Sequence, residues 1–475
     1  MLFSSPIFLF LFLPIVLLVY FLAPKKIKNS ILLLSSLVFY TWGEQELVIL
    51  IILSALVDYS CGLIISIGKR KLGLILSILF NLGILFYFKY SNFIYTNLAT
   101  LLESYDFTSA NAQYFANIVL PIGISFYTFQ TMSYTIDVYK GKVKANKNFI
   151  DFATYVTLFP QLIAGPIVRY SHIELELKNR DVSLTNFSIG VERFIIGLAK
   201  KVIIANNCAI LVDGIFNLPV TEMSSLIGWI GIFAFGIQIY YDFSGYSDMA
   251  IGLGKMLGFN FPENFNYPYT AKSIQEFWTR WHITLSTWFR DYVYIPLGLR
   301  SSSKKYRMLI LMLVFFLTGF WHGANWNFIV WGLLHGIFII FEKLGLTKTL
   351  KKVHVLLTNF YTIFVVFVTF PFFRCDDLGE ALRYIQNLFT FSNPTNYDYL
   401  NFYLSKEIAF ILCIGTLFSI PLYLNISRFI KSKNLSVSKL NTLGYLKSIG
   451  LFLLLLLNYM YISKGNYNPF IYFNF

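Results

Sequence analysis

Charged side chains are scarce in this chain of 475 residues, of which only 13% are Asp, Glu, Lys or Arg. A soluble globular protein carries about 25%, because its surface has to be wetted. Apolar residues make up 56% of the chain, aromatic residues make up 19%, and the mean hydropathy is +0.62. These values exclude a soluble enzyme, a disordered chain and a nucleic-acid-binding domain, so no nucleic-acid partner is expected.

The long apolar segments also lack a regular alternation of apolar and polar residues. This excludes a porin-type barrel, whose strands alternate with period two. At roughly 20 residues per crossing, the apolar content suffices for no more than about thirteen spanning helices. We therefore predict an all-α polytopic membrane protein, with one membrane-embedded domain over residues 1–475 and membrane lipids as its surroundings.

Cysteine is rare as well. The four cysteines share no close spacing and lie mostly in apolar runs: Cys61, Cys208, Cys375 and Cys413. This pattern indicates neither a metal motif nor a disulfide framework, and we expect packing residues. Histidine and carboxylate residues at metal-ligand spacing are also missing, so no metal site is predicted.

Acidic residues are outnumbered, with 38 Lys and Arg against 24 Asp and Glu, for a net charge of +14. In a membrane protein such an excess marks the cytoplasmic loops. Basic clusters at 25–28, 69–71 and 140–147 separate apolar runs, whereas no Lys or Arg lies between Lys89 and Lys140. The pattern places the N-terminus and the loop 94–116 outside and the lysine clusters inside.

The apolar runs predict roughly ten to twelve crossings, two of them in the central region 150–300. Outside that region the expected spans lie near 1–24, 30–43, 46–67, 72–93, 117–137, 308–322, 326–342, 355–373, 407–425 and 446–463. The central region interrupts short apolar stretches with prolines and charges. These residues are Pro160, Pro166, Arg169, Lys200, Lys201, Asp242, Asp248, Arg280, Arg290 and Asp291. Irregular backbone at membrane depth is tolerated where it is buried or lines a wet cavity, so we expect re-entrant or interfacial helices around a central tunnel.

Two of the five histidines are candidates for chemistry. His322 follows an apolar run near the outer end of a predicted helical hairpin, where a neutral imidazole suits the role of a base. His282 lies in the tryptophan-rich stretch 277–291, and if this stretch is helical, His282 and Ser286 share a face. Structural alternatives remain for both: a backbone-bonded histidine at a helix turn, and an amphipathic interfacial helix.

The other histidines are expected to be structural. His335 lies between Gly332 and Gly336, a pair of small residues that lets another helix approach, and we expect it to hydrogen-bond between helices. His354 follows two lysines and is expected at the surface. For His172 both a structural and a tunnel-lining position remain open.

Five sequence blocks resemble a known family. They are PIGISFYTFQ at 121–130, FPQLIAGPIVR at 159–169, YDFSGYSDMA at 241–250, and the Trp-His pairs at 281–282 and 321–322. In these blocks the chain is similar to the membrane-bound O-acyltransferases, specifically the bacterial branch of alginate and peptidoglycan O-acetyltransferase membrane subunits. The blocks span about 120–340, the motif-bearing core. Leu299 stands where a second glycine is expected, which affects only a local turn.

The resemblance implies a transmembrane O-acyltransferase of the bacterial plasma (inner) membrane. It implies transfer of an acetyl group from cytoplasmic acetyl-CoA for O-acetylation of an extracytoplasmic polysaccharide, either peptidoglycan or alginate-like. No permanently bound cofactor is expected, and a periplasmic or other extracytoplasmic acetyltransferase partner is expected to complete the transfer. His322 matches the principal catalytic histidine and His282 the second. Supporting or tunnel-lining residues are expected at Asp242, Asp248, Arg280, Trp281, Ser286, Arg290, Trp321 and Asn325.

Two alternatives to acetyl transfer remain. The related branch that transfers D-alanine to teichoic acid shares the motifs, but the chain length and the uninterrupted WHGANW block at 321–326 favour the acetyl branch. A solute transporter or flippase with a histidine in its pathway is what membrane physics alone predicts. The set of five motifs makes this second alternative the weaker one.

Overall fold

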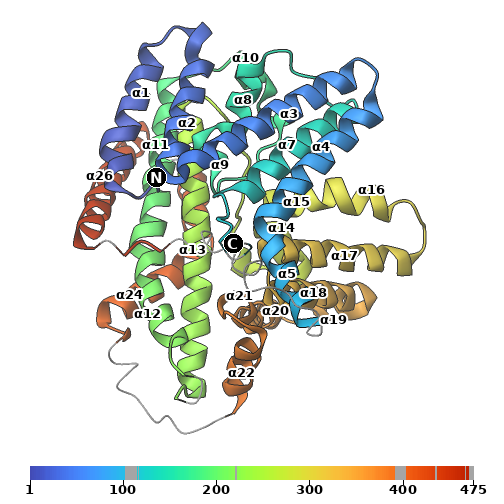
Figure 1. Ribbon diagram of the computed structural model, residues 1–475. Coiled ribbons are helices and arrows are strands. Elements are labelled where there is room, and N and C mark those ends of the chain that lie inside the picture. Colours follow the sequence, from blue (N-terminus) through green and yellow to red (C-terminus); the bar gives the residue numbers. More distant parts are fainter. Residues whose placement is uncertain are drawn as a thin grey trace.

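Helices account for nearly all of the regular structure in the computed structural model (Figure 1). The structure describes residues 1–101, 115, 117–219, 222–390, 403–433, 436–465 and 467–469. Within these residues it contains no strand, and the predicted all-α membrane fold is confirmed. Most of the expected outer loop at 94–116 lies outside the described residues.

The N-terminal helices pack through buried polar side chains as well as apolar ones. They are η1 (Phe8–Phe12), α1 (Leu13–Leu22), α2 (Lys28–Glu44), α3 (Val48–Ser66), α4 (Arg70–Leu85), η4 (Phe86–Tyr90), α5 (Ser91–Leu101) and α7 (Ile124–Tyr139). Asp58 on α3 accepts hydrogen bonds from Ser77 and Asn81 on α4 (2.7 Å from Asn81), and Thr131 on α7 donates to Asn81 at 3.0 Å. Because a buried polar group is costly without a partner, these bonds favour one arrangement of the three helices.

The central region combines two long helical segments with several short helices. It contains α8 (Phe149–Thr157), α9 (Phe159–Leu162), α10 (Tyr170–Lys178), α11 (Leu184–Ala199), η5 (Lys200–Ala205), α12 (Asn206–Phe216), α13 (Ser225–Met256), η6 (Pro268–Thr270), α14 (Ile274–Arg280), α15 (Ile283–Phe289), η7 (Arg290–Tyr294) and α16 (Ile295–Gly298). Glycines let α11 approach α13 closely, since a Cβ on Gly190 would lie 2.6 Å from the carbonyl oxygen of Gly252. The two crossings predicted for this region correspond to 184–216 and 225–256.

The C-terminal part begins with a helical hairpin that carries one of the motifs. Its helices are α17 (Lys304–His322), α18 (Trp326–Phe341), η8 (Glu342–Leu346), α19 (Thr347–Leu350), α20 (Val355–Thr369), α21 (Pro371–Arg374), α22 (Leu378–Phe389), α24 (Lys406–Phe418), α25 (Leu422–Ser432) and α26 (Val437–Lys464). In Figure 1, α26 lies against the outer side of α1 and α11, at the opposite edge of the molecule from α16 and α17.

Fewer helices than expected are long and apolar enough to cross a membrane. Seven qualify among the described residues: Lys25–Ser66, Arg70–Leu101, Leu184–Phe216, Ser225–Met256, Trp326–Leu350, Val355–Arg374 and Val437–Lys464. An eighth qualifies if the bent pair Lys406–Phe418 and Leu422–Ile430 is one span. The number is lower than the expected ten to twelve partly because Lys25–Ser66 is taken as one segment of 42 residues. Within it the expected spans 30–43 and 46–67 are two separate helices, α2 and α3, which meet at a break where Gln45 has φ of 46°. In addition, the runs near 1–24 and 117–137 form helices that are too short.

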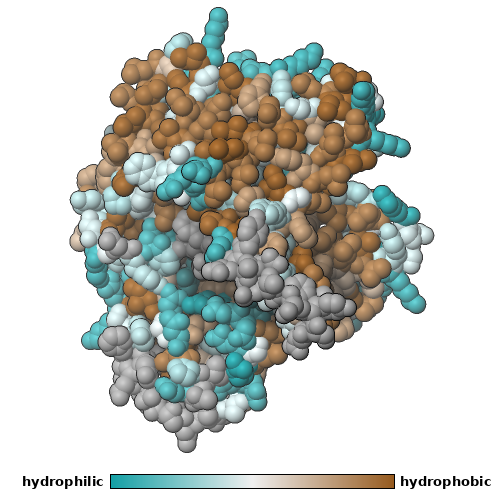
Figure 2. All heavy atoms as spheres, viewed as in Figure 1, coloured by the Kyte–Doolittle hydropathy of each residue, from teal (hydrophilic) through white to brown (hydrophobic). Residues whose placement is uncertain are grey.

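The surface separates apolar from polar regions along the molecule. In Figure 2 the upper half is a broad hydrophobic area with hydrophilic residues along its top rim, and further hydrophilic residues gather towards the centre and lower left. The turns after α1 and α3, which carry the lysine clusters 25–28 and 69–71, lie at the top of Figure 1. The ends of α12 and α22 lie at the bottom.

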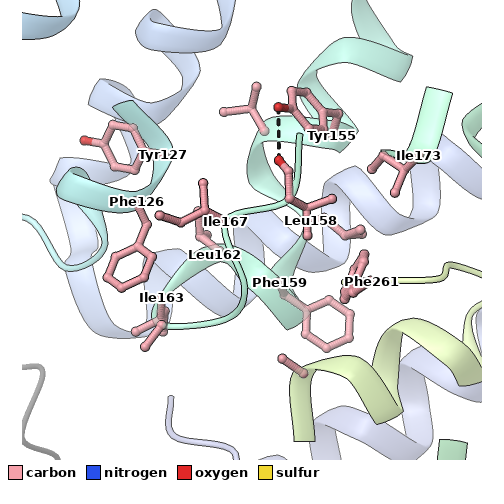
Figure 3. Packing of buried hydrophobic residues seen from close by; sticks show 14 of the residues in the cluster. Phe126, Tyr127, Tyr155, Leu158, Phe159, Leu162, Ile163, Ile167, Ile173 and Phe261 are labelled. Atoms are coloured by element: carbon pink, nitrogen blue, oxygen red, sulfur yellow. Dashed lines mark hydrogen bonds between the residues drawn. The ribbon is translucent and has the colours of Figure 1, made fainter. Parts of the chain in front are cut away.

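The motif at 159–169 begins with the short helix α9 and continues as irregular, buried backbone to the start of α10 (Figure 3). Phe159, Leu162 and Ile167 are packed in the apolar core around it. Its backbone groups find partners on other elements: the Tyr155 hydroxyl donates to the carbonyl of Val168 at 3.2 Å, and the N–H of Ile167 donates to Thr284 Oγ1 at 3.0 Å. This confirms irregular backbone buried inside the protein in the central region, as predicted.

Candidate active site

His322 is the last residue of α17, where the helix turns into the hairpin that leads to α18. The chain leaves the helix in an extended conformation at Gly323, and the side chain of Asn325 caps α18 by accepting from the N–H of Asn327 at 3.2 Å. The hairpin is tight because Gly332 presents no side chain: a Cβ there would collide with the carbonyl of Phe315. The position of His322 therefore depends on two closely packed helices.

The imidazole of His322 is buried among aromatic rings and is only 2% exposed. The ring centroids of Trp321, Trp331 and Phe373 lie 5.0, 5.2 and 5.3 Å from it, all in edge arrangements. A void of about 10 Å³ adjoins it, with Trp281 and His335 among the lining residues. This void has room for about one water molecule.

A much larger cavity of about 810 Å³ is lined by Gly323, the residue that follows His322. About half of its lining residues are polar or charged, and the lining includes the hairpin turn. The residues are Lys89, Leu120, Asp213, Asn217, Phe235, Gln238, Gly323, Ala324, Asn325, Phe328, Phe373, Arg374, Cys375, Asp376, Asn468 and Pro469. Phe373 lines both spaces, and a tunnel that connects them stays a prediction. α12, which carries Asp213, ends at the bottom of Figure 1, away from the lysine-rich turns.

Lys89, which sequence reasoning missed, holds the end of α17. It lies in η4 with 8% of its surface exposed. Its ammonium donates to the carbonyl of Trp321 at 2.5 Å, to Ser125 Oγ at 3.1 Å and to the carbonyl of His322 at 3.4 Å. A positive charge is favourable at a helix C-terminus, where carbonyl groups lack partners. The available signal was a single lysine inside an apolar run, which costs roughly 2.5–3.5 kcal/mol at mid-membrane.

His282 lies at a break in the chain between α14 and α15. The stretch 277–291 is therefore not one helix, and the helical premise that placed His282 and Ser286 on one face is wrong. The backbone of His282 has φ of 43°, in the left-handed region that few non-glycine residues adopt. Such a conformation persists when its surroundings over-determine it, and it is typical of functional sites.

Asn264 fixes the tautomer of His282. Its Oδ1 accepts from the N–H and the hydroxyl of Thr284 at 3.1 and 2.9 Å, so Nδ1 of His282, 3.2 Å away, must donate its proton. The other ring nitrogen, Nε2, then carries the lone pair. It is buried and has no hydrogen-bond partner among the described residues.

Trp321 is close to both histidines. Its ring centroid is 6.0 Å from that of His282 and 5.0 Å from that of His322. Its indole N–H donates to the carbonyl of Ser125 at 3.3 Å, which ties it to α7. The structure thus brings the two histidines predicted from separate motifs close to one buried tryptophan.

The sequence profile described as "MBOAT, membrane-bound O-acyltransferase family" matches residues 37–375. This is more than half of the chain and includes both histidines. The chain belongs to the membrane-bound O-acyltransferase family. It is an acyltransferase, and the resemblance drawn from the motifs is confirmed.

Similar proteins place it in a bacterial part of this family. The chain is 42% identical over 405 residues to a probable alginate O-acetylase AlgI of Azotobacter vinelandii, covering 84% of this chain and 80% of that protein. It is 32% identical over 523 aligned positions to a peptidoglycan O-acetyltransferase of Helicobacter pylori, covering 100% and 98%. A teichoic acid D-alanyltransferase of Bacillus subtilis is 31% identical over 272 residues, covering 54% of this chain and 67% of that protein.

Other motif residues of this acyltransferase take part in local contacts. Trp281 lines the void beside His322, and Ser286 contacts the Trp281 carbonyl at 3.5 Å. Asn325 lines the large cavity, but its amide already caps α18 and donates to the Asp376 carbonyl at 2.8 Å. A direct role for these residues in acyl transfer stays a prediction.

The two aspartates of the YDFSGYSDMA block form ion pairs between helices. Asp242 pairs with Lys201 at 2.5 Å, and Asp248 pairs with Arg193 at 2.8 Å and with Lys200 at 2.6 Å. All these partners lie on α11 or η5, so the pairs join these elements to α13. This position explains the motif through packing, and a tunnel-lining role stays a prediction.

The predicted arginines of the central region also have carboxylate partners. Arg280 pairs with Glu276 one turn earlier at 2.8 Å, and Arg290 donates to Asp291 at 2.7 Å. Arg169 pairs with the same Asp291 at 2.8 Å. Burial acts to raise the pKa of Asp291, but the hydrogen bonds from the two arginines lower it below its usual range. The contribution of Arg280 and Arg290 to substrate entry stays a prediction.

His335 and His354 lie as expected, the first between helices and the second at the surface. Trp278 Nε1 donates to His335 Nδ1 at 3.3 Å, which leaves the proton on Nε2 to be donated to Thr369 Oγ1 at 3.1 Å. His335 therefore links α18 to α14 and α20. His354 is exposed and caps α20, and His172 is exposed on α10, which favours a structural position over a tunnel-lining one.

Proposed function

We propose that this acyltransferase moves an acetyl group from acetyl-CoA on the cytoplasmic side of a bacterial plasma membrane to a polysaccharide outside, with the N-terminus on the outer side. The observation that carries the proposal is a buried histidine that lines a small void and is followed directly in the chain by Gly323, which lines a large cavity. The named activities of the alginate and peptidoglycan relatives support an acetyl group as the cargo.

His322 is proposed as the group that takes the proton from the acceptor hydroxyl. The hydroxyl oxygen forms a new bond to the acetyl carbon, the carbon–sulfur bond of the thioester breaks, and the proton passes from the imidazole to the leaving thiolate. In a variant of the same chemistry, the imidazole of His322 first takes the acetyl group from the thioester and releases the thiol. The acceptor hydroxyl then takes the acetyl group from the imidazole. Burial among aromatic rings excludes water, which would otherwise hydrolyse the thioester.

Lys89 and the hairpin turn are proposed to position this histidine. The ammonium of Lys89 lines the cavity and lies 5.7 Å from the centroid of the Trp321 ring. It holds the backbone of His322 while adding a positive charge to the space where the acceptor enters. A positive charge in a site that excludes water favours the negative oxygen that develops on the acetyl carbon in the transition state.

The final acceptor is proposed to be reached through an extracytoplasmic partner. The large cavity has room for a side chain that delivers a hydroxyl to His322, and the partner then transfers the acetyl group to the glycan. Peptidoglycan and an alginate-like polysaccharide are both acceptors named among the relatives. The acyltransferase itself needs no permanently bound cofactor in this scheme.

D-Alanine transfer to teichoic acid is the second candidate function, and the 31% identity to the Bacillus subtilis relative supports it. Hydroxylamine cleaves oxygen esters and releases the acyl group for identification. Release of acetate from purified envelopes supports the acetyl proposal, whereas release of D-alanine supports the second candidate.

The same assay tests His322. We expect the variant His322→Ala to abolish release of ester-linked acetate from cell envelopes, because the proton acceptor is lost. His172→Ala, which changes an exposed histidine on α10, serves as the control and should keep normal acetate. Full ester acetate in cells with normal amounts of the His322→Ala protein would contradict the assignment.

A further inference from the structure

A separate cavity of about 260 Å³ lies where the turn between α1 and α2 meets the end of α10 and the residues that follow it. Four basic side chains line it: Lys25 and Lys28 from the first segment, and Lys178 and Arg180 from the second. The acidic residues Glu176 and Asp181 line it as well. The carboxylate of Glu176 is already occupied by the backbone N–H and the amide of Asn260. The basic side chains therefore give the pocket its excess of positive charge.

Arg180 is built into the wall of this pocket. Its guanidinium stacks over Phe259 with the central carbon 4.7 Å from the ring centroid, and over Tyr20 at 5.8 Å. One terminal nitrogen, Nη1, is buried and has no hydrogen-bond partner among the described residues. A buried donor without a partner costs free energy, so it favours a ligand that supplies an oxygen atom.

Lys28 adds a second cation to the same wall. Its ammonium lies 4.4 Å from the centroid of the Tyr20 ring, the ring that Arg180 also contacts. The Tyr20 hydroxyl donates to the carbonyl of Leu257 at 2.7 Å, which fixes the ring between the two cations. Two cations are thus held against the same tyrosine ring, and one guanidinium nitrogen has no partner among the described residues. This arrangement suits a phosphate whose oxygen atoms bind both cations.

Exposed apolar residues adjoin the pocket in the sequence on both sides. Leu22, three residues before Lys25, is 77% exposed, and Leu184, two residues after Val182, is 89% exposed. The turn between α1 and α2 belongs to the lysine-rich end of the molecule, at the top of Figure 1. A basic pocket beside exposed leucines at this end matches a lipid whose phosphate enters the pocket and whose acyl chains run along the helices.

We propose that this pocket binds the phosphate of an anionic phospholipid of the cytoplasmic leaflet. The site joins the turn between α1 and α2 to the segment 176–182, so its lipid stabilises the packing of this turn on that segment. A soluble phosphate compound shares this chemistry, and the experiment below separates the two sources. The proposal concerns binding alone and does not depend on which acyl group the enzyme transfers.

The test compares the full-length protein purified in detergent with added phosphatidylglycerol or phosphatidylcholine. Bound lipid is counted by native mass spectrometry, and the midpoint of thermal unfolding is measured in parallel. Wild-type protein should retain phosphatidylglycerol and unfold at a higher temperature with it than with phosphatidylcholine, because a ligand that binds only the folded state stabilises that state. Equal retention and equal midpoints with both lipids would overturn the proposal.

The pocket variant is Lys28→Gln with Arg180→Gln, and its matched control is Lys69→Gln with Lys71→Gln. The control removes two exposed charges from the basic cluster between α3 and α4. We expect the pocket variant to bind phosphatidylglycerol on the order of tenfold or more weakly and to lose the shift in midpoint, while the control keeps both. If both variants lost phosphatidylglycerol binding equally, the lipid would be attracted to surface charge in general. That result would overturn the proposed binding site.

Two further arms complete the experiment. If loss of the Arg180 stacking prevents folding, Lys25→Gln with Lys178→Gln removes two charges from the pocket lining instead and should weaken phosphatidylglycerol binding in the same direction. Adenosine 3′,5′-bisphosphate, a soluble phosphate compound, is added in place of lipid. If it raises the midpoint in an Arg180-dependent manner and displaces phosphatidylglycerol, the pocket belongs to a nucleotide phosphate and the lipid assignment is wrong.

Discussion

The ammonium of Lys89 is buried because it binds backbone carbonyls at the end of α17. Moving a lysine into the membrane interior is costly, and Lys89 offsets that cost with three hydrogen bonds to uncharged oxygen atoms, two of them carbonyls at the end of α17. Because one of these carbonyls belongs to His322 itself, the lysine and the candidate catalytic histidine are mechanically coupled. An uncharged residue of similar length would leave the carbonyls without a donor.

We expect Lys89→Met to lower the rate of acetyl transfer by roughly tenfold or more, equivalent to about 1.4 kcal/mol in the activation barrier. The physical reason is loss of the donor that fixes the backbone of His322. Lys89→Arg should recover part of the activity, since it retains the charge. Turnover of acetyl-CoA by purified protein checks this, with Lys71→Met, an exposed lysine on α4, as the control. Unchanged turnover in Lys89→Met would refute the coupling.

The backbone and the side chain of His282 make separable contributions. Its left-handed conformation is tolerated by asparagine but is strained for a β-branched residue. His282→Asn should therefore keep the thermal stability within a few degrees and lose most of the activity, because only the imidazole is removed. His282→Val should lose both. Thermal unfolding and acetyl-CoA turnover of the two variants are compared; equal stability of the two would show that the conformation carries no strain.

At the scale of elements, the α17–α18 hairpin determines where His322 lies. Three glycines let the two helices touch, and the sequence predicted this contact from the pair Gly332 and Gly336. The break at His282 was not predictable, because its cause is a single left-handed residue whose side chain bonds to Asn264, 18 residues earlier in the chain. The spacing of apolar residues identifies helices, but a helix break that depends on contacts with residues distant in the sequence leaves no mark in that spacing.

The hairpin gives a direct stability test. Gly332→Ala should lower the midpoint of thermal unfolding, because the new methyl group meets the Phe315 carbonyl, and such overpacking costs roughly 1–3 kcal/mol. Gly83→Ala is the matched control: it lies in α4 with open space at its Cβ, so the midpoint should stay equal or rise slightly. A midpoint for Gly332→Ala equal to that of Gly83→Ala would mean that the two helices separate easily.

At the scale of the whole molecule, the sequence predicted the all-helical fold, the buried irregular centre and the family. Its count of crossings is higher than the number of long apolar helices, because apolar length alone does not tell whether a run folds into a helix too short to span the membrane, as at 124–139. It identified His322 and His282 through motifs but missed Lys89. The hydrogen bonds by which Lys89 holds the end of α17 join residues more than 200 positions apart in the sequence, so no local pattern indicates them.

The central claim is that His322 mediates acyl transfer across the membrane from the cytoplasmic side. The most direct measurement supplies radiolabelled acetyl-CoA to sealed inside-out membrane vesicles, whose outer surface is the cytoplasmic face, and counts ester-linked label in the lumen. We predict luminal label with the wild-type protein and none with His322→Ala. Equal luminal label in both, or equal labelling of right-side-out vesicles supplied from outside, would contradict the account.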